Sequence, residues 1–253
     1  MFEALIGFSC VLGLVMLRMP IAFAMGLVGM IGYMYETSFR GAISMVSRLI
    51  IDTSQDYGLS VVPLFILMGL FVNKGGISRE LYAVSNAFLG HMRGGLAMAT
   101  IVACGGFAAV CGSSLATAAT MSKVAMPEMR KYNYADSLST ASIAAGGTLG
   151  ILIPPSVILV IYGLLTETSI GKLFMAGIIP GLIGILGYLL AVRYTVMRNP
   201  AAGPAGPRVG WGGRLKALRG GWAVLLLFFL VIGGLYGVLN FWPINFAFSP
   251  TEA

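Results

Sequence analysis

Charged residues are scarce in this chain: they make up 10% of its 253 positions, against about 25% in typical soluble domains. Hydrophobic residues make up 58%, and the mean hydropathy is +0.90. A water-soluble core does not need so large an excess of apolar side chains. The composition therefore indicates a protein that lies in a lipid bilayer.

Histidine and cysteine are also rare. His91 is the only histidine, so the sequence holds no HExxH zinc motif. Cys10, Cys104 and Cys111 are isolated in apolar sequence, without CxxC or Cys/His spacing. This pattern favours small buried hydrophobic residues over a metal site or a disulfide framework.

The motifs expected of an enzyme are missing as well. There is no GxxxxGK[ST] run, so no ATP-hydrolysing P-loop is encoded. Asp136 and Glu167 fall at the ends of hydrophobic segments, and no histidine lies within one. A nucleophile with its base, or a carboxylate pair, is therefore not expected inside the membrane. We predict that the chain is not an enzyme and that an ion gradient supplies its energy.

The net charge of +7 comes from basic residues scattered between apolar segments. Such scatter does not suit nucleic acid, whereas a local cluster of arginine and lysine is typical of a cytoplasmic loop. Six of the sixteen basic residues form one such cluster: Arg193, Arg198, Arg208, Arg214, Lys216 and Arg219. We expect the bilayer, and no nucleic acid, as the surroundings of this chain.

Hydropathy predicts an all-α polytopic membrane protein. The approximate hydrophobic segments are 4–17, 20–35, 59–73, 95–126, 138–165, 173–196 and 222–240. Two amphipathic stretches, 36–58 and 74–93, are predicted to lie along the membrane surface. The second reads as an arm helix with Ser78 as its N-cap, after two glycines.

The segment 138–165 contains a predicted helix break. Two adjacent prolines remove backbone donors and disfavour helix at the residue before them. Freed carbonyls at membrane depth need protein or a wet cavity, and broken helices commonly form ion and substrate sites in secondary transporters. A proline-kinked structural helix or an interfacial loop is the alternative. The candidate binding residues here are Gly146, Gly147, Thr148, Pro154, Pro155 and Ser156.

The segment 94–126 is predicted to be a re-entrant hairpin. Arg93 and the basic pair 130–131 place both of its flanks on the cytoplasmic side, so it must enter and leave by one face. Its tip offers hydroxyls, carbonyls and free N–H groups, which suit Na⁺ and an anionic group. Two tightly packed helices with small contact residues remain the alternative. The candidate tip residues are Gly112, Ser113, Ser114 and Thr117, with Ser113, Ser114 and Thr148 as the expected Na⁺ ligands.

Five runs of sequence resemble the large membrane subunit, of DctM type, of tripartite ATP-independent periplasmic (TRAP) transporters. They are VPLFILMG at 62–69, GHMRGG at 90–95, GSSLAT at 112–117, GGTLGILIPPS at 146–156 and AGIIPG at 176–181. Their order and spacing are similar to those of that family across most of the chain.

The resemblance implies a multi-pass protein of the bacterial inner membrane. Its function would be Na⁺-coupled symport of a small organic anion, such as a C4-dicarboxylate, a keto acid or a sialic acid. The implied partners are a periplasmic substrate-binding protein and a small DctQ-type membrane subunit, and Na⁺ is the coupling ion with no further cofactor. Another Na⁺-coupled organic anion transporter of the same fold, or a non-transporting structural membrane fragment, are the alternatives.

The resemblance also implies a fold of two inverted repeats that moves as an elevator. Residues 1–220 would form the first repeat: scaffold spans, arm helix, hairpin 94–126, broken helix 138–165, span 173–196 and basic cytoplasmic loop 197–220. Residues 221–253 would begin the second. Because members of the family are longer, we expect an incomplete chain that is inactive alone.

Overall fold

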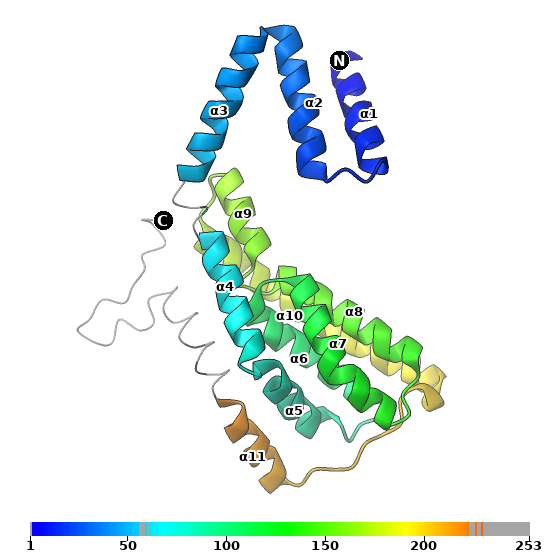
Figure 1. Cartoon of the computed structure of the whole chain (residues 1–253). Coiled ribbons are helices and arrows are strands. Elements are labelled where there is room, and N and C mark those ends of the chain that lie inside the picture. The colour runs from blue at the N-terminus through cyan, green and yellow to red at the C-terminus, as the bar shows by residue number, and fades with distance from the viewer. Residues whose placement is uncertain (1, 56–58, 60, 223–225, 227–228, 230–253) are drawn as a thin grey trace, which may run out of the picture. The chain divides into compact units, whose positions relative to one another are not determined.

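The computed structural model describes residues 2–55, 59, 61–222, 226 and 229, and the regular elements in these ranges are all helices (Figure 1). This confirms the predicted all-α class. The predicted segment 222–240 lies almost wholly outside the described residues. The helices are α1 Phe2–Met16, α2 Ile21–Glu36, α3 Phe39–Gln55, α4 Val61–Lys74, α5 Ile77–Leu89, α6 Gly95–Cys111, α7 Ser114–Lys131, α8 Asp136–Leu152, α9 Val157–Leu165, α10 Ile170–Arg198, the 3₁₀ turn Pro200–Ala202 and α11 Trp211–Gly220.

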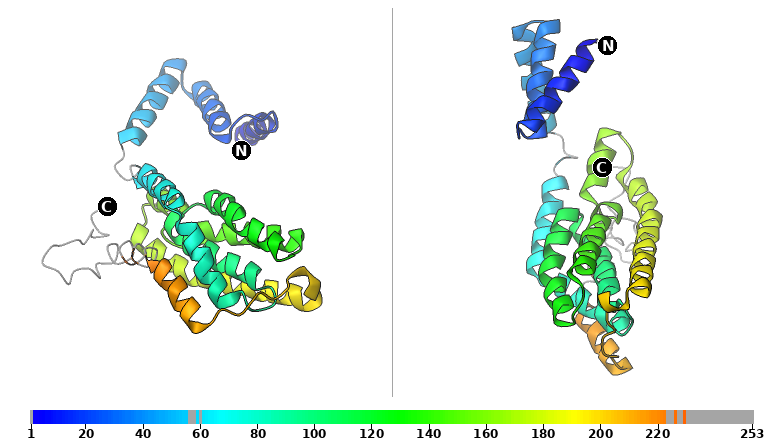
Figure 2. Two further views of the ribbon diagram at one scale, coloured as in Figure 1. Left: turned by 60° about the horizontal axis from the view of Figure 1, so that its bottom comes forward. Right: turned by 90° about the vertical axis from the view of Figure 1, so that its right-hand side faces the viewer.

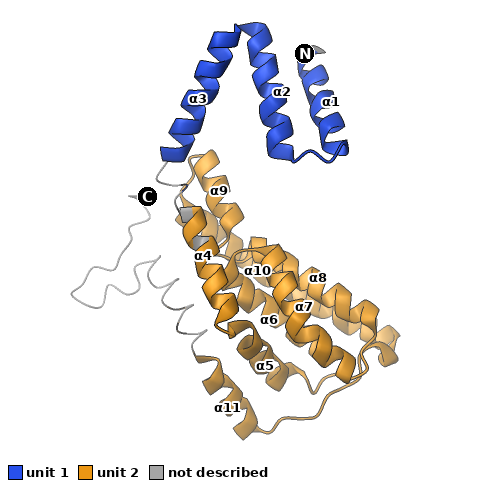
Figure 3. Cartoon of the chain, in the orientation of Figure 1, with its two compact units in different colours: residues 1–59 blue, residues 60–253 orange. Residues whose placement is uncertain are grey.

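The chain divides into two compact units, residues 1–59 and residues 60–253 (Figure 3). This division concerns spatial contacts within the chain. The predicted boundary near residue 220 concerns a sequence repeat instead, and it stays a prediction.

Unit 1 consists of α1, α2 and α3, each packed on the next along the chain. Arg18 adopts a left-handed conformation (φ 67°) in the turn before Pro20, and α2 begins directly after that proline. Helix α3 occupies the predicted amphipathic stretch 36–58. Most large apolar side chains of this unit are exposed, and Cys10 is exposed too, so the prediction that it is buried was wrong.

Unit 2 is built around α6, which packs against α4, α5, α7, α8 and α10. Two views show α6, α7 and α8 side by side in this unit (Figures 1 and 2). Fifteen of the 17 residues of α6 are buried, Cys104 and Cys111 among them, as predicted for these two cysteines. The centre of the unit is therefore one helix surrounded by others.

Helix α5 occupies the predicted arm, but its start differs from the prediction. Gly76, in the left-handed region at φ +77°, precedes the helix, and its carbonyl accepts hydrogen bonds from the backbone N–H groups of Arg79 and Glu80. Gly76 is thus the N-cap, and the assignment of Ser78 was wrong. Ser78 lies buried in the first turn of the helix.

Residues 202–206, which follow α10, form a strap across two turns of unit 2. Its backbone bonds are Gly94 N–H to Gly203 O (2.9 Å), Ala135 N–H to Ala202 O (3.0 Å) and Gly206 N–H to Gly90 O (2.9 Å). The Tyr134 hydroxyl accepts from Leu96 N–H (3.2 Å) and donates to Pro204 O (2.8 Å). Burial raises the pKa of Tyr134, which keeps this hydroxyl protonated as a donor.

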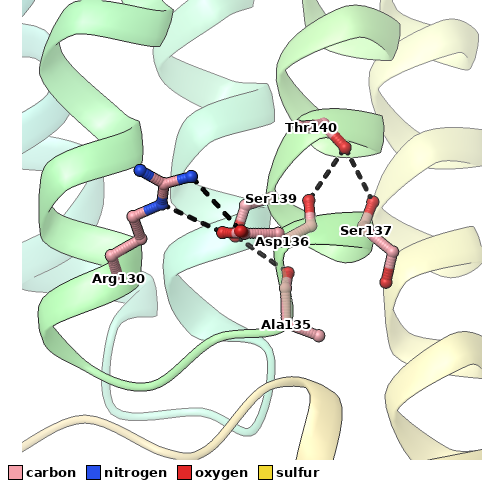
Figure 4. Close-up of polar contacts among 6 residues, drawn as sticks. All are labelled: Arg130, Ala135, Asp136, Ser137, Ser139 and Thr140. Atoms are coloured by element: carbon pink, nitrogen blue, oxygen red, sulfur yellow. Dashed lines mark hydrogen bonds and ion pairs between the residues drawn. The ribbon is translucent and has the colours of Figure 1, made fainter.

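The turn between α7 and α8 is held by side chains at its exposed end (Figure 4). The Arg130 guanidinium donates through Nε to Asp136 Oδ1 (3.0 Å) and through Nη2 to Asp136 Oδ2 (3.2 Å). Ser139 donates to Ala135 O, and Thr140 donates to Asp136 O. These contacts fix the start of α8.

By length and hydropathy, two stretches of the described chain could cross a membrane. They are Asp136–Leu165, which is α8 and α9 taken together, and Ile170–Arg198. Four other apolar helices are shorter: Glu3–Met16, Ile21–Glu36, Val62–Lys74 and Gly95–Cys111. The full set of predicted spans and their orientation stay predictions.

Candidate ion and substrate site at two crossing helix interruptions

The first interruption is the reversal between α6 and α7. Gly112 has φ +61°, in the left-handed region that glycine adopts without steric cost. Ser113 is extended and caps α7, since its Oγ accepts from Ala116 N–H (3.4 Å). The two helices form a hairpin with its tip where the sequence predicts it. Helix α7 continues through Pro127 to Lys131, beyond the predicted end of the hairpin at residue 126. Re-entry into a membrane stays a prediction.

The second interruption lies between α8 and α9. Helix α8 ends at Leu152, and residues 153–156 are not helical, with a cis peptide between Pro154 and Pro155. Ser156 is fully buried, and its hydroxyl donates to Ile151 O (3.0 Å). The protein itself therefore satisfies one of the carbonyls that the break releases.

The two interruptions pack against each other through glycine. A Cβ added at Gly112 would lie 2.9 Å from Pro155 O, and the Val157 N–H donates to Gly112 O (3.4 Å). Conversely, a Cβ added at Gly150 would lie 2.8 Å from Ser114 N. Each interruption thus occupies space that a side chain on the other would need.

Two further glycines of α8 face the hairpin. A Cβ at Gly147 would lie 2.8 Å from the Ala118 Cβ of α7, and one at Gly146 would lie 2.8 Å from Cys104 Sγ of α6. Both were candidate residues, and the structure brings them together with the hairpin as close packing surfaces.

Four helix ends meet at this crossing: the C-termini of α6 and α8 and the N-termini of α7 and α9. Helix C-termini present unpaired carbonyls, and helix N-termini present N–H groups with partial positive charge. Among the described residues no group of three His, Cys, Asp or Glu side chains could hold a metal. The oxygen donors at the crossing are hydroxyls and carbonyls, and N–H groups of the two helix N-termini lie beside them.

Most candidate hydroxyls at the crossing are already bonded to the backbone. Thr117 is fully buried and donates to Ser113 O (2.7 Å), while Ser113 caps α7 and Ser156 bonds the end of α8. Ser114 differs, because its half-buried hydroxyl makes no hydrogen bond to the part of the chain that the structure describes. Ser114 is thus the candidate hydroxyl whose proton and lone pairs are both left for a ligand.

Thr148 is not grouped with the tip serines. Its Oγ1 lies 2.7 Å from Ala145 O and 2.9 Å from the hydroxyl of Tyr188 in α10. Successive helical residues point about 100° apart, so Gly147 can face the hairpin while Thr148 faces α10. Tyr188 was not among the predicted residues, and no sequence pattern pointed to it.

Three glycines outside the candidate set complete the packing. A Cβ at Gly69 of α4 would lie 3.3 Å from Cys111 O, at the end of α6. On α10, a Cβ at Gly177 would lie 2.8 Å from Leu152 O, and one at Gly181 would lie 2.8 Å from Ile153 Cγ1. The four-residue spacing of Gly177 and Gly181 is the signal of close helix packing that could have identified them.

A cavity of about 480 Å³ lies beside the break, between α5, α6 and α10. Ser85 is the only lining residue with a hydroxyl, and the other lining residues are apolar or glycine. The cavity is thus distinct in chemistry from the crossing. Its lining residues are Leu81, Val84, Ser85, Val102, Gly105, Gly106, Ala109, Ile153, Pro154, Ile178, Leu182 and Ile185.

Known proteins are similar to this chain over most of its length. The "C4-dicarboxylate TRAP transporter large permease protein DctM" of Pseudomonas aeruginosa is 42% identical over 80% of this chain and 45% of its own. The protein of the same description in Vibrio cholerae is 35% identical over 97% of this chain and 52% of its own length. The "Ectoine TRAP transporter large permease protein TeaC" of Halomonas elongata is 34% identical over 97% of this chain and 55% of its own length. The chain spans about half the length of these curated relatives.

The family model of the "Tripartite ATP-independent periplasmic transporter, DctM component" matches residues 8–253. This match and the similarity to the relatives confirm the resemblance seen in the sequence. Members of the family are transporters rather than enzymes. The chain belongs to the DctM family of tripartite ATP-independent periplasmic transporters.

Proposed function

We propose that this chain serves in the large subunit of a Na⁺-coupled symporter that imports a small organic anion across the bacterial inner membrane. The observation that carries the proposal is the reciprocal packing of Gly112 on the break and of Gly150 on the hairpin tip. It brings the ends of four helices together in a chain whose family is one of transporters.

Na⁺ would bind on the hydroxyl and carbonyl side of this crossing. Ser114 is the available hydroxyl, and the carbonyls at the ends of α6 and α8 are the further oxygen donors. Ser113 and Ser156 would shape the site, because Ser113 caps α7 and the Ser156 hydroxyl bonds the end of α8. The substrate carboxylate would lie near the N-termini of α7 and α9, where the helix dipoles favour negative charge.

Ion coupling is physically sufficient for this import. Moving one charge across 100 mV corresponds to about 2.3 kcal/mol, so two or more Na⁺ could offset the entry of a dianion. We propose that the hairpin and the broken helix move together as the transporting part of an elevator-type inverted repeat. Gly177 and Gly181 of α10 pack against the break and would move with it.

The substrate class is a C4-dicarboxylate or a related small organic anion. The P. aeruginosa relative named for C4-dicarboxylate is 42% identical to this chain, whereas the V. cholerae relative of the same description and the ectoine relative are 35% and 34% identical. Identity therefore supports a C4-dicarboxylate through the first relative and does not separate the two substrates through the other two. A periplasmic binding protein and a DctQ-type subunit are the proposed partners, which the word "tripartite" in the family description supports.

Transport would be tested with labelled succinate in proteoliposomes. They would contain this chain, the remaining part of the P. aeruginosa relative, its small subunit and its binding protein. We expect uptake that requires an inward Na⁺ gradient and the binding protein, and that falls at least about tenfold when K⁺ replaces Na⁺. Uptake that is equally fast in K⁺ would contradict Na⁺ coupling.

Ion binding can be measured on the chain alone by thermal unfolding. The buried thiols of Cys104 and Cys111 report unfolding through a thiol-reactive dye, in a Cys10→Ala background that removes the exposed thiol. A ligand that binds only the folded chain raises Tm. Na⁺ at ten times its Kd should raise it by about 3 °C relative to K⁺. Equal Tm values in both salts at every concentration would refute an ion site within this chain.

A further inference from the structure

Helix α11 exposes a row of large apolar side chains. Trp211 and Leu215 are 74% and 67% exposed, and Leu218 is exposed one turn further on. Trp222, two residues beyond the end of the helix, is 61% exposed. At about 100° per residue the three positions within α11 fall within a sector of about 60° on one side of the helix. We call this row the tryptophan stripe.

The contact of α11 with α5 lies beside the stripe. The Arg214 guanidinium lies over the ring of Phe88 in α5, 5.7 Å from its centroid, and 5.2 Å from that of Trp211. A Cβ at Gly221 would lie 2.9 Å from Val84 Cγ2, also in α5. Arg214 and Gly221 thus hold one side of α11 on α5 (Figure 1), while the stripe lies on a different side.

The charged residues of α11 and of the chain directly before it are all basic. Arg208, Lys216 and Arg219 are exposed, and no aspartate or glutamate occurs between Glu167 and Glu252. Arginine and lysine beside exposed tryptophan and leucine are typical of a helix that lies on an anionic lipid surface. With ten residues, α11 is too short to cross a bilayer.

We propose that α11 is a surface anchor that binds anionic phospholipid. The tryptophan stripe inserts at the boundary between headgroups and acyl chains, and Arg208, Lys216 and Arg219 contact lipid phosphates. Through Arg214 on Phe88, the anchor holds the end of α5 at the membrane surface. The inference uses the membrane location of the family, and it is independent of Na⁺ coupling and of the substrate.

The test follows Trp211 as the sole tryptophan of the full chain. Trp222→Phe and Trp242→Phe leave Trp211 alone, and the protein is reconstituted into vesicles of phosphatidylcholine with phosphatidylglycerol. Bromine placed high on the acyl chains should lower Trp211 emission about twofold, and acrylamide in the water should quench it weakly. Bromine carried on phosphatidylglycerol should quench Trp211 emission more than bromine carried on phosphatidylcholine at equal density. Added salt should reduce this difference in quenching.

Two variants complete the test. Arg208→Gln, Lys216→Gln and Arg219→Gln together should abolish the preference for brominated phosphatidylglycerol, since each charge near the surface alters lipid preference about fivefold. Gly220→Trp, in a chain with the three native tryptophans replaced by phenylalanine, places the reporter on the side of α11 opposite the stripe, at a position where a Cβ meets open space. It should be quenched by acrylamide rather than by bromine. Free quenching of Trp211 by acrylamide would overturn the proposal. Shielding of Trp211 from both quenchers would overturn it too, in favour of a protein partner.

Discussion

Helices α1 and α6 are both apolar and of similar length, 15 and 17 residues, yet their surroundings differ. Fifteen residues of α6 are buried within the chain, whereas none of the described side chains of α1 is. Glycine, alanine and cysteine supply ten positions of α6 and only four of α1, where leucine, valine and phenylalanine predominate. Residue size therefore separates the two helices better than hydropathy does.

The physical reason is that hydropathy does not distinguish lipid from protein as surroundings. Lipid tails are as apolar as leucine, so helices in a membrane associate where small residues let their backbones approach. Helix α6 offers such a surface to α8, through Cys104 against Gly146, and to α4, through Cys111 against Gly69. The candidate site lies at the end of this small-residue helix. In a membrane permease, the large side chains of α1 are expected to face lipid or another subunit.

The strongest test of this difference between α1 and α6 is to change the size of one side chain in each helix. Ala108→Leu in α6 adds volume at a position with 0% exposure, and overpacking of this kind costs about 1–3 kcal/mol or more. Phe8→Ala in α1 removes a side chain that is 69% exposed and should change little. Thermal unfolding in the Cys10→Ala background should show a fall in Tm of about 5 °C or more for the first variant. Equal falls for both variants would remove the distinction between the two helices.

The next effect concerns the hairpin tip. Gly112→Ala combines a left-handed backbone, costing about 1–2 kcal/mol, with a Cβ 2.9 Å from Pro155 O. Gly76→Ala is the matched control, because its φ is also positive (+77°) but a Cβ there meets open space. Gly112→Ala should lower Tm more than Gly76→Ala does, and the difference between the two falls measures the contact of the tip with the break. If Gly76→Ala destabilises the chain as much, the tip and the break do not press on each other.

The sequence predicted the interruptions because their signals are local. A proline pair ends a helix wherever it stands, and Gly112 before two serines permits a reversal and supplies a cap. The same local rules failed at α5, where Gly76 rather than Ser78 begins the helix. Both residues suit an N-cap, and only the left-handed turn at Gly76 decided between them.

The rest of the site depends on which side of each helix faces which neighbour. Thr148 was grouped with Ser113 and Ser114 because all three carry hydroxyls near an interruption. The structure instead pairs Thr148 with Tyr188, which lies 40 positions further along the chain. The strap at 202–206 is likewise made of backbone bonds between distant residues, for which no side-chain pattern exists. Such contacts follow from packing rather than from local sequence.

A smaller effect is expected where the strap meets α6. Tyr134→Phe removes the acceptor of Leu96 N–H and the donor to Pro204 O, and a buried group left unpaired costs about 1–3 kcal/mol. Tyr132→Phe is the control, because no hydrogen bond of its hydroxyl is found in the described part of the chain. The Tm should fall for the first variant only, and faster hydrogen exchange at Leu96 should accompany it. An unchanged exchange rate at Leu96 would show that the strap does not hold the start of α6.

The smallest effect on stability separates the two hydroxyls of the ion proposal. Ser114→Ala removes a hydroxyl that makes no hydrogen bond within the described chain, so Tm in K⁺ should change by less than about 1 °C. The rise in Tm caused by Na⁺ should be lost, since the proposed ligand oxygen is gone. Thr148→Val should do the reverse: it breaks the 2.9 Å contact with Tyr188, lowers Tm slightly and leaves the Na⁺ effect intact. Should Thr148→Val abolish the Na⁺ effect while Ser114→Ala keeps it, the ion would bind on the α10 side of α8. The small-residue contact between α8 and the hairpin would then be packing alone.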